Sequence, residues 1–265
     1  MQKFHYLIEE PADYYHWQAK ENLSSHQLIE FINCPLMYFK KLTGLIKDRD
    51  SQCYSFGRAA HTLILEGREV FEDEYAVGGP VNPKTGKPFG SNTKAFAAWA
   101  DEIGKPVISS EELVTLEFMQ NQVLTHPIAP ALITGGFAEG VCRVDYCGLP
   151  SQIRMDYFNP EKGIADLKTC DSLDKFEFDA RRYGYISQLA FYRAVLKEAS
   201  GIQADVHIVA IEKREPFRCG VWKISEMALD EAQHENEQHI EELKNCIESD
   251  LWPTRFEDVR ILDLF

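Results

Sequence analysis

The segment GIADLKTC, residues 163–170, places an acid and a base two residues apart in an otherwise apolar stretch. Alternate side chains of a strand share a face, so Asp166 and Lys168 would point the same way. Asp156 lies ten residues earlier, and a tight turn at 159–160 would bring it close to Asp166. Two carboxylates on neighbouring strands suit Mg²⁺ or Mn²⁺, which prefer oxygen ligands. A lysine beside them could orient a water molecule or stabilise charge on a phosphoryl oxygen.

Each of these residues also has a simpler interpretation. An acid and a lysine on one strand often form a solvated salt bridge that contributes little to stability. Gln188 and Tyr192 share a helix face with Tyr185, and such a face is often just partly buried. His61, four residues after a glycine, would by itself be read as a core histidine. Only their occurrence together favours an active site.

The elements that would position these side chains follow from periodicity, caps and turn residues. A capping box formed by Ser24 and Gln27 starts a helix, and Pro35 breaks or restarts it. Gly201 is a suitable C-cap for the helix that carries Gln188. Strands are expected at 136–146, 150–158, 163–170, 204–213 and 221–225. Further helices are expected at 56–67, 93–104, 109–126, 181–201 and 226–250, and a loop at 78–93.

Length and patterning predict one α/β (α+β) domain over residues 1–265, with a core at about 20–225 and an acidic helical segment at about 226–265. The net charge of −14 argues against a general nucleic-acid coating protein but not against a nuclease, because metal sites are themselves acidic. Much of the acid lies in 226–250, which we interpret as a solvated amphipathic helix, with a subunit contact as the alternative. Its expected inward residues are Leu229, Ile240, Leu243 and Ile247.

The seven cysteines form no C-x-x-C pair, which indicates reduced thiols and neither a disulfide framework nor a zinc ribbon. No apolar run is long enough to span a bilayer, and the first residues do not resemble a signal peptide. We therefore expect a cytoplasmic protein that does not contact a membrane.

Together the motif residues resemble the PD-(D/E)XK nucleases, and within them the RecB-like and RecE-type (exonuclease VIII) nuclease domains of phages and prophages. The core pattern reads Asp156, then Asp166-Leu167-Lys168, then the Q-x-x-x-Y box from Gln188 to Tyr192. Asp166 stands where many relatives have glutamate, a change that the family tolerates. The resemblance runs from about residue 20 to about residue 225 and implies a restriction-endonuclease-like core, a central mixed β-sheet flanked by helices.

Other segments extend the resemblance. His61 matches the histidine of a G-x-x-x-H element that binds metal in these enzymes. Glu139 matches an acid that precedes the strand pair, and R-x-D reads here as Arg154 to Asp156. Relatives that hold an iron–sulfur cluster have closely spaced final cysteines, which this chain lacks, so we expect no cluster.

The resemblance also implies a role for each residue. Asp156, Asp166, His61 and the Leu167 carbonyl would bind Mg²⁺, for which Mn²⁺ would substitute, with Glu139 as a further catalytic residue. Lys168 would face the scissile phosphate and Asp166 the metal, so the two would not pair with each other. Gln188 and Tyr192 would orient DNA or Lys168. Candidate contacts to the DNA backbone are Arg58, Lys84, Lys87, Lys94, Arg154, Arg181 and Arg182.

The function implied is 5′-to-3′ exonuclease digestion of linear double-stranded DNA that leaves 3′ overhangs for recombination by single-strand annealing. Its partners would be DNA ends, a RecT-like annealing protein and further copies of the chain in a ring. Two alternatives stay open: an endonuclease of restriction or repair type, and a non-catalytic acidic partner in DNA recombination. Cleavage of covalently closed DNA would distinguish the first alternative, and failure to cleave any DNA the second.

Overall fold

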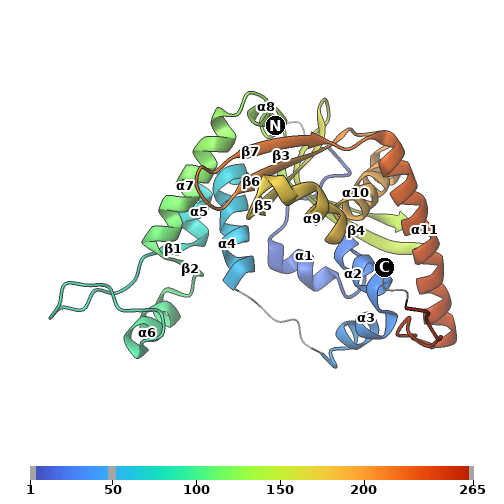
Figure 1. Cartoon of the computed structure of the whole chain (residues 1–265), viewed down its shortest axis with the longest axis horizontal. Coiled ribbons are helices and arrows are strands. Elements are labelled where there is room, and N and C mark those ends of the chain that lie inside the picture. Colours follow the sequence, from blue (N-terminus) through green and yellow to red (C-terminus); the bar gives the residue numbers. More distant parts are fainter. Residues whose placement is uncertain (1–3, 47–51, 263–265) are drawn as a thin grey trace.

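The structure is a computed structural model that describes residues 4–46 and 52–262, without the side chains of 52–54 (Figure 1). The helices are α1 Ala12–Gln18, α2 Ser25–Asn33, α3 Pro35–Leu42, α4 Gln52–His61, α5 Arg68–Glu74, α6 Lys94–Ile103, α7 Ser110–Thr125, α8 Ala129–Leu132, α9 Phe176–Arg182, α10 Tyr185–Ser200 and α11 Glu226–Ser249. A π-helical turn covers Thr62–Glu66 and a 3₁₀ turn Leu173–Lys175. The strands are β1 Ala76–Val77, β2 Val107–Ile108, β3 Phe137–Tyr146, β4 Leu149–Asn159, β5 Gly163–Cys170, β6 Val206–Glu212 and β7 Cys219–Lys223.

The central sheet has five strands in the order β3-β4-β5-β6-β7. Its neighbouring strands are antiparallel except β5 and β6, which pair in parallel. A parallel pair needs a long crossover connection, and α9 with α10 supplies it. The mixed sheet flanked by helices confirms the predicted fold class, and the five expected strands are all present, each within a few residues of its expected bounds.

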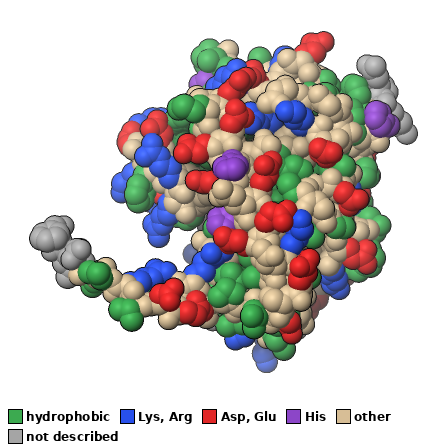
Figure 2. All heavy atoms as spheres, turned by 90° about the vertical axis from the view of Figure 1, so that its right-hand side faces the viewer, with side chains coloured by type: hydrophobic (Ala, Val, Ile, Leu, Met, Phe, Trp, Pro, Cys, Tyr) green, Lys and Arg blue, Asp and Glu red, His purple; other side chains and the backbone are tan. Residues whose placement is uncertain are grey.

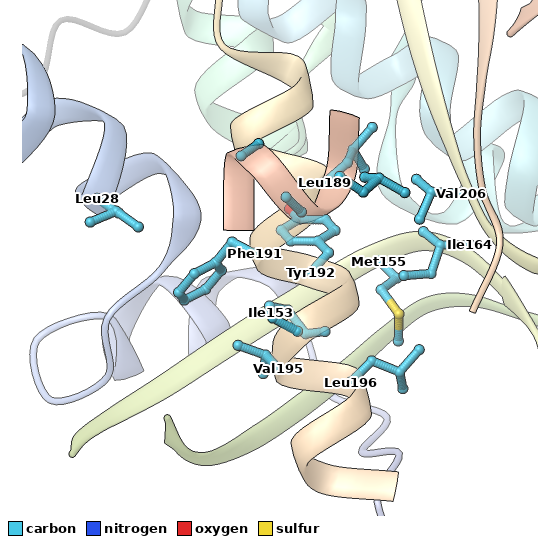
Figure 3. Packing of buried hydrophobic residues seen from close by; sticks show 14 of the residues in the cluster. Leu28, Ile153, Met155, Ile164, Leu189, Phe191, Tyr192, Val195, Leu196 and Val206 are labelled. Carbon is cyan, nitrogen blue, oxygen red and sulfur yellow. The ribbon is translucent and has the colours of Figure 1, made fainter. Parts of the chain in front are cut away.

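Side chains alternate between two apolar cores on the two faces of the sheet. On β5, Ile164 belongs to the core that includes residues of α2, α10 and α11. Ala165 and Leu167 belong to the other core, with residues of α4, α5 and α7. Figure 3 shows side chains of α10 among those of the strands that it covers. The segment that carries Asp166 and Lys168 is thus enclosed by the core on both faces.

Local signals fix several helix ends as expected. Ser24 and Gln27 form the predicted capping box of α2, and Pro35 occupies the first turn of α3. Gly201 ends α10 in the left-handed conformation. One prediction about helix continuity was wrong, because the helix expected at 181–201 is interrupted at Gly184, which has a φ of 71° and separates α9 from α10. The helix expected at 56–67 is present, although it begins at Gln52 and continues after His61 as a π-helical turn that ends before Gly67.

Residues 226–249 of the acidic segment form the long helix α11, as expected, and pack on α10. The helical segment expected as far as about residue 265 is shorter, because residues 250–262 are not helical. Leu229, Ile240 and Leu243 are buried, but Ile247 in the last turn is 52% exposed, so its predicted inward position was wrong. The apolar stripe of α11 therefore extends past the core. Figure 2 shows Asp and Glu side chains in many separate places on the face where α11 lies. In the part of the chain that the structure describes, no helix is both long and apolar enough to cross a membrane.

Candidate active site

The site forms where strands β4 and β5 separate. Their ladder pairs Asn159 with Gly163, Phe158 with Ile164 and Tyr157 with Ala165, and then it ends. Asp156 lies one residue beyond this ladder on β4 and Leu167 two residues beyond it on β5, and the Leu167 amide donates a 2.8 Å hydrogen bond to Oδ2 of Asp156. The Asp156 carboxylate thus takes the place of a backbone acceptor, which satisfies the Leu167 amide where the strand partner is lost.

A group of three side chains that could hold a metal ion surrounds Asp156. His61 at the end of α4, Glu139 on β3 and Asp156 on β4 each offer a ligand atom, and these atoms lie within 4.8 Å of one another. His61 Nδ1 is 3.4 Å from Asp156 Oδ2. Two carboxylates and one imidazole fit a divalent cation such as Mg²⁺ or Mn²⁺. Among the described side chains, those of residues 4–46 and 55–262, no other group of His, Cys, Asp and Glu meets this condition.

The protonation of Asp156 depends on its neighbours. Burial alone would raise the pKa of this carboxyl, but His61, Lys168 and the Leu167 amide lower it to about 2. The same contact with Asp156 raises the pKa of His61, although burial of the imidazole acts in the opposite direction. The two residues therefore stabilise each other as an ion pair, and a metal ion would replace the proton on His61 as the positive partner.

Glu139 is held in an unusual backbone conformation, with a φ of 54° in the left-handed region. Its carboxylate lies 2.9 Å from Nε of Arg154 on the adjacent strand. Burial and the nearby Asp156 charge nevertheless raise the pKa of Glu139 to about 7, against the effect of Arg154. Two partly buried carboxylates this close together disfavour each other's charge, and a bound cation would relieve that repulsion.

Asp166 and Lys168 contact each other, contrary to the expectation that they would not pair. Lys168 Nζ lies 2.7 Å from Oδ2 of Asp166, whose side chain is fully buried. Burial raises the pKa of Asp166 to about 6, although Lys168 opposes that rise, while the Asp166 and Asp156 carboxylates raise the pKa of Lys168. The pairing follows from burial, because an ammonium group out of water requires a nearby opposite charge.

Asp166 is thus outside the group of His61, Glu139 and Asp156. Its Oδ2 atom contacts Lys168, but its Oδ1 atom has no hydrogen-bond partner within the described residues and is available to a further ligand. A buried carboxylate oxygen without a donor is rare in folded proteins, and a metal ion or its water shell would satisfy it. Metal ligation by Asp166 and by the Leu167 carbonyl stays a prediction.

Gln188 and Tyr192 lie on α10 as predicted and are joined by a 3.1 Å hydrogen bond from the amide to the hydroxyl. Both are buried. Burial first, and then the Tyr15, Asp156 and Asp166 charges, raise the pKa of Tyr192 well above its ordinary value. The pair therefore lies close to the carboxylates, but it makes no recorded contact with Lys168.

The predicted DNA-contact residues occupy different places. Arg154 lies in the site itself, bound to Glu139. Arg58 is exposed on α4, and Arg181 and Arg182 are exposed at the end of α9. Lys84 and Lys87 in the loop and Lys94 at the start of α6 are exposed on a part of the chain that projects from the body in Figure 1. No contact joins these three lysines to the site.

Sequence reasoning missed two histidines that border the site. The pKa of His26 on α2 is lowered by surrounding protein atoms first and by the Lys168 charge second, although its side chain is still exposed. The pKa of His16 on α1 is lowered in the same way, with Arg154 and Arg58 as the nearby charges. Both lie in the N-terminal helices, and their distance from the motifs in sequence gave no signal of this proximity.

The comparison with protein families shows to which family the chain that carries this site belongs. Residues 24–264 match the model of DUF3799, a PDDEXK-like domain of unknown function. The chain belongs to this family. This match confirms the expected membership of the PD-(D/E)XK nuclease superfamily and its restriction-endonuclease-like fold. No curated protein matches the chain.

Two solved structures resemble the DUF3799 domain. One is a protein from Eubacterium rectale assigned provisionally as an exonuclease, with 16% identity, a TM-score of 0.70 and 97% of each chain covered. At this identity, the likeness shows a shared fold. The other is LHK-Exo in complex with dAMP, with 17% identity, a TM-score of 0.30, and 60% of this chain and 85% of that chain covered. A TM-score of 0.30 is too low to support any conclusion about this chain.

Proposed function

We propose that this domain is a metal-dependent exonuclease that hydrolyses phosphodiester bonds of linear double-stranded DNA. The observation that carries the proposal is the convergence of His61, Glu139 and Asp156 beside the buried Asp166–Lys168 pair. Carboxylates and an imidazole can hold a cation, and an ammonium group beside them can stabilise charge on a phosphoryl oxygen, so together these groups suit phosphodiester hydrolysis. The PDDEXK-like family supports this reading of the site.

Each residue would contribute a distinct part of the reaction. A bound Mg²⁺ ion, or Mn²⁺ in its place, supplies Lewis-acid polarisation of the phosphate and lowers the pKa of a water molecule. His61, Glu139 and Asp156 would hold the cation, with Asp166 and the Leu167 carbonyl as further ligands. Lys168 would place its positive charge against the phosphate oxygen on which charge develops. Arg154 would keep Glu139 charged and oriented toward the cation.

The choice of exonuclease over endonuclease rests on two likenesses. The Eubacterium rectale protein with the same fold carries an exonuclease assignment. The motifs resemble the RecE-type domains of phages and prophages, from which we carry over 5′-to-3′ polarity, 3′ overhangs, a RecT-like annealing partner, a homo-oligomeric ring and a cytoplasmic location. A ring would need positive potential only along its channel, which is compatible with a net charge of −14.

The test uses linear duplex DNA and covalently closed duplex DNA of the same sequence, each incubated with the protein and Mg²⁺. We expect complete digestion of the linear DNA and none of the closed circle. Cleavage of the circle would show an endonuclease, and failure on both substrates, with Mn²⁺ also tried, would favour a non-catalytic partner. Linear DNA labelled at one end and blocked at each end in turn then measures polarity.

A further inference from the structure

A series of aromatic rings leads from Lys168 to the protein surface. The Lys168 ammonium lies 4.8 Å from the centre of the Tyr185 ring. The Tyr185 and Tyr183 rings are 5.9 Å apart and inclined by 34°. The guanidinium carbon of Arg182 is 5.7 Å from the Tyr183 ring. Tyr183 is 54% exposed, so this series begins at the buried lysine and ends in solvent.

The break between α9 and α10 sets the positions of these rings. Gly184 has a φ of 71°, which brings the last turn of α9 and the first residue of α10 together. Tyr185 also packs on Phe176, with 6.2 Å between ring centres, and Phe176 packs in turn on Trp222 at 4.6 Å. The inner ring is therefore supported by the core, whereas Tyr183 presents its ring to solvent.

Two cations without counter-charges accompany the exposed ring. Arg181 and Arg182 are both exposed, and neither forms an ion pair with any residue in the described part of the chain. By contrast, Arg218 binds both Glu212 and Asp174. The Asp179 charge contributes to the raised pKa of Tyr185 and therefore lies near that ring. A bound anion would be repelled by Asp179 and would lie on the side of the two arginines.

An aromatic ring with adjacent arginines suits one type of ligand. Nucleobases stack on tyrosine rings whatever their sequence, and arginine binds the phosphates between them. In the interior of a duplex both faces of each base are covered by the neighbouring pairs, whereas an unpaired base leaves its faces free to stack on an isolated ring. The distances of 4.8 and 5.9 Å place the Tyr183 ring no more than about 11 Å from the Lys168 ammonium, a distance that a few nucleotides of one strand can span.

We propose that Tyr183, with Arg181 and Arg182, binds an unpaired nucleobase and the adjoining phosphates of a single DNA strand whose next phosphates reach Lys168. This inference rests on the proposed function, since it names the form in which DNA enters or leaves that site. The enzyme would then melt or separate the end of the duplex and hold one strand by stacking. Recognition would be independent of sequence and dependent on salt concentration.

The structure supplies a matched control. Phe118 and Phe217 also form an exposed stacked pair, with ring centres 5.5 Å apart and an interplanar angle of 6°. Phe118 is 51% exposed, nearly as much as Tyr183, but it lies on α7 and no contact connects it with Lys168. Loss of the Phe118 ring should therefore remove a similar exposed aromatic surface without affecting the binding of the DNA strand.

The experiment measures binding of a fluorescent single-stranded oligonucleotide by anisotropy, with the full chain in EDTA to prevent cleavage. We expect Tyr183→Ala to weaken binding roughly tenfold, because base stacking on one aromatic ring has that order of effect. Tyr183→Phe keeps the ring and should bind like the wild type, as should Phe118→Ala. Arg182→Ala should reduce the slope of log affinity against log salt concentration by about 0.7. Equal affinity of Tyr183→Ala and Phe118→Ala would overturn the inference.

A second measurement separates this inference from the proposed function. The same variants are incubated with linear duplex DNA and Mg²⁺. If the wild type cleaves DNA but Tyr183→Ala binds the oligonucleotide normally, the exonuclease proposal stands and the stacking site is wrong. If the wild type does not cleave DNA but Tyr183→Ala still loses oligonucleotide binding, the stacking site stands and the proposed activity is wrong.

Discussion

The backbone amide of Leu167 donates a 2.8 Å hydrogen bond to the carboxylate of Asp156, at the point where β4 and β5 stop pairing. This contact joins the two motif strands through a side chain where no backbone bond is formed. It also fixes one Asp156 oxygen, Oδ2, which is 3.4 Å from His61. The orientation of the central carboxylate is therefore set by the sheet before any ligand binds.

Removal of the Lys168 ammonium should abolish cleavage and largely preserve metal binding. The Lys168→Ala variant leaves His61, Glu139 and Asp156 in place but removes the charge that would stabilise the transition state, a loss of about 100-fold or more in rate. Cleavage of linear DNA and calorimetric binding of Mn²⁺ measure the two effects. Lys197→Ala, an exposed lysine at the far end of α10, is the control. Full activity of Lys168→Ala would refute the assigned role.

Neutralisation of Asp156 should remove cleavage and metal binding together. Asp156→Asn keeps the shape and an oxygen that can accept the Leu167 hydrogen bond, but it removes the charge at the centre of the ligand group. We expect the affinity for Mn²⁺ to fall at least about tenfold, since even residues that only support metal ligands have effects of that size. Asp145→Asn, an exposed acid on β3, should change neither property. Unchanged Mn²⁺ affinity in Asp156→Asn would place the cation elsewhere.

Glu212 should stabilise the fold in a pH-dependent way. It accepts hydrogen bonds from Arg218 and from the Leu173 amide, and those to Arg218 come first in lowering its pKa from the ordinary 4.5 to about 2. Its contribution is therefore fully present above pH 4.5 and is lost as the pH falls toward 2. We expect Glu212→Gln to lower the free energy of unfolding by about 1–2 kcal/mol at pH 7, after allowance for the solvent around Arg218.

Urea unfolding at pH 7, 5 and 3.5 checks this dependence on Glu212. The difference between wild type and Glu212→Gln should be equal at the two higher values and smaller at the lowest. Glu235→Gln, which replaces an exposed acid on α11 that forms no ion pair with any described residue, serves as the control and should show no such trend. A difference that is constant over all three pH values would mean that the ionised carboxylate contributes nothing.

The start of β5 should tolerate only glycine. Gly163 has a φ of 92°, and a Cβ atom there would lie 2.0 Å from the Asp205 carbonyl oxygen, which accepts a hydrogen bond from Ile164. Gly163→Ala should therefore lower the free energy of unfolding by about 2–4 kcal/mol. Gly90→Ala, where nothing lies within 4 Å, should change it by less than about 0.5 kcal/mol. Equal unfolding midpoints in urea for the two variants would contradict this account.

The sequence by itself determined the local elements and the direction of the motif side chains. The alternation in GIADLKTC places Asp166 and Lys168 on one face, because strand geometry depends only on the chain around them. The capping box of Ser24 and Gln27 acts over only three residues. The Ser24 hydroxyl accepts from the Gln27 amide, the Gln27 side chain accepts from the Ser24 amide, and these two contacts are sufficient to start α2. Membership of the PD-(D/E)XK superfamily followed from the same short motifs.

The tertiary structure alone decided which of these residues meet. Glu139 and His61 lie 78 residues apart, and only the packing of α4 against the sheet brings both to Asp156. The pairing of Asp166 with Lys168 depends on burial. Burial is a property of the whole core, so the three-residue motif alone does not predict it. The path from Lys168 through Tyr185 to Tyr183 likewise required the break at Gly184, where a continuous helix had been expected. Contacts between distant segments arise from packing of the complete chain, so no local pattern encodes them.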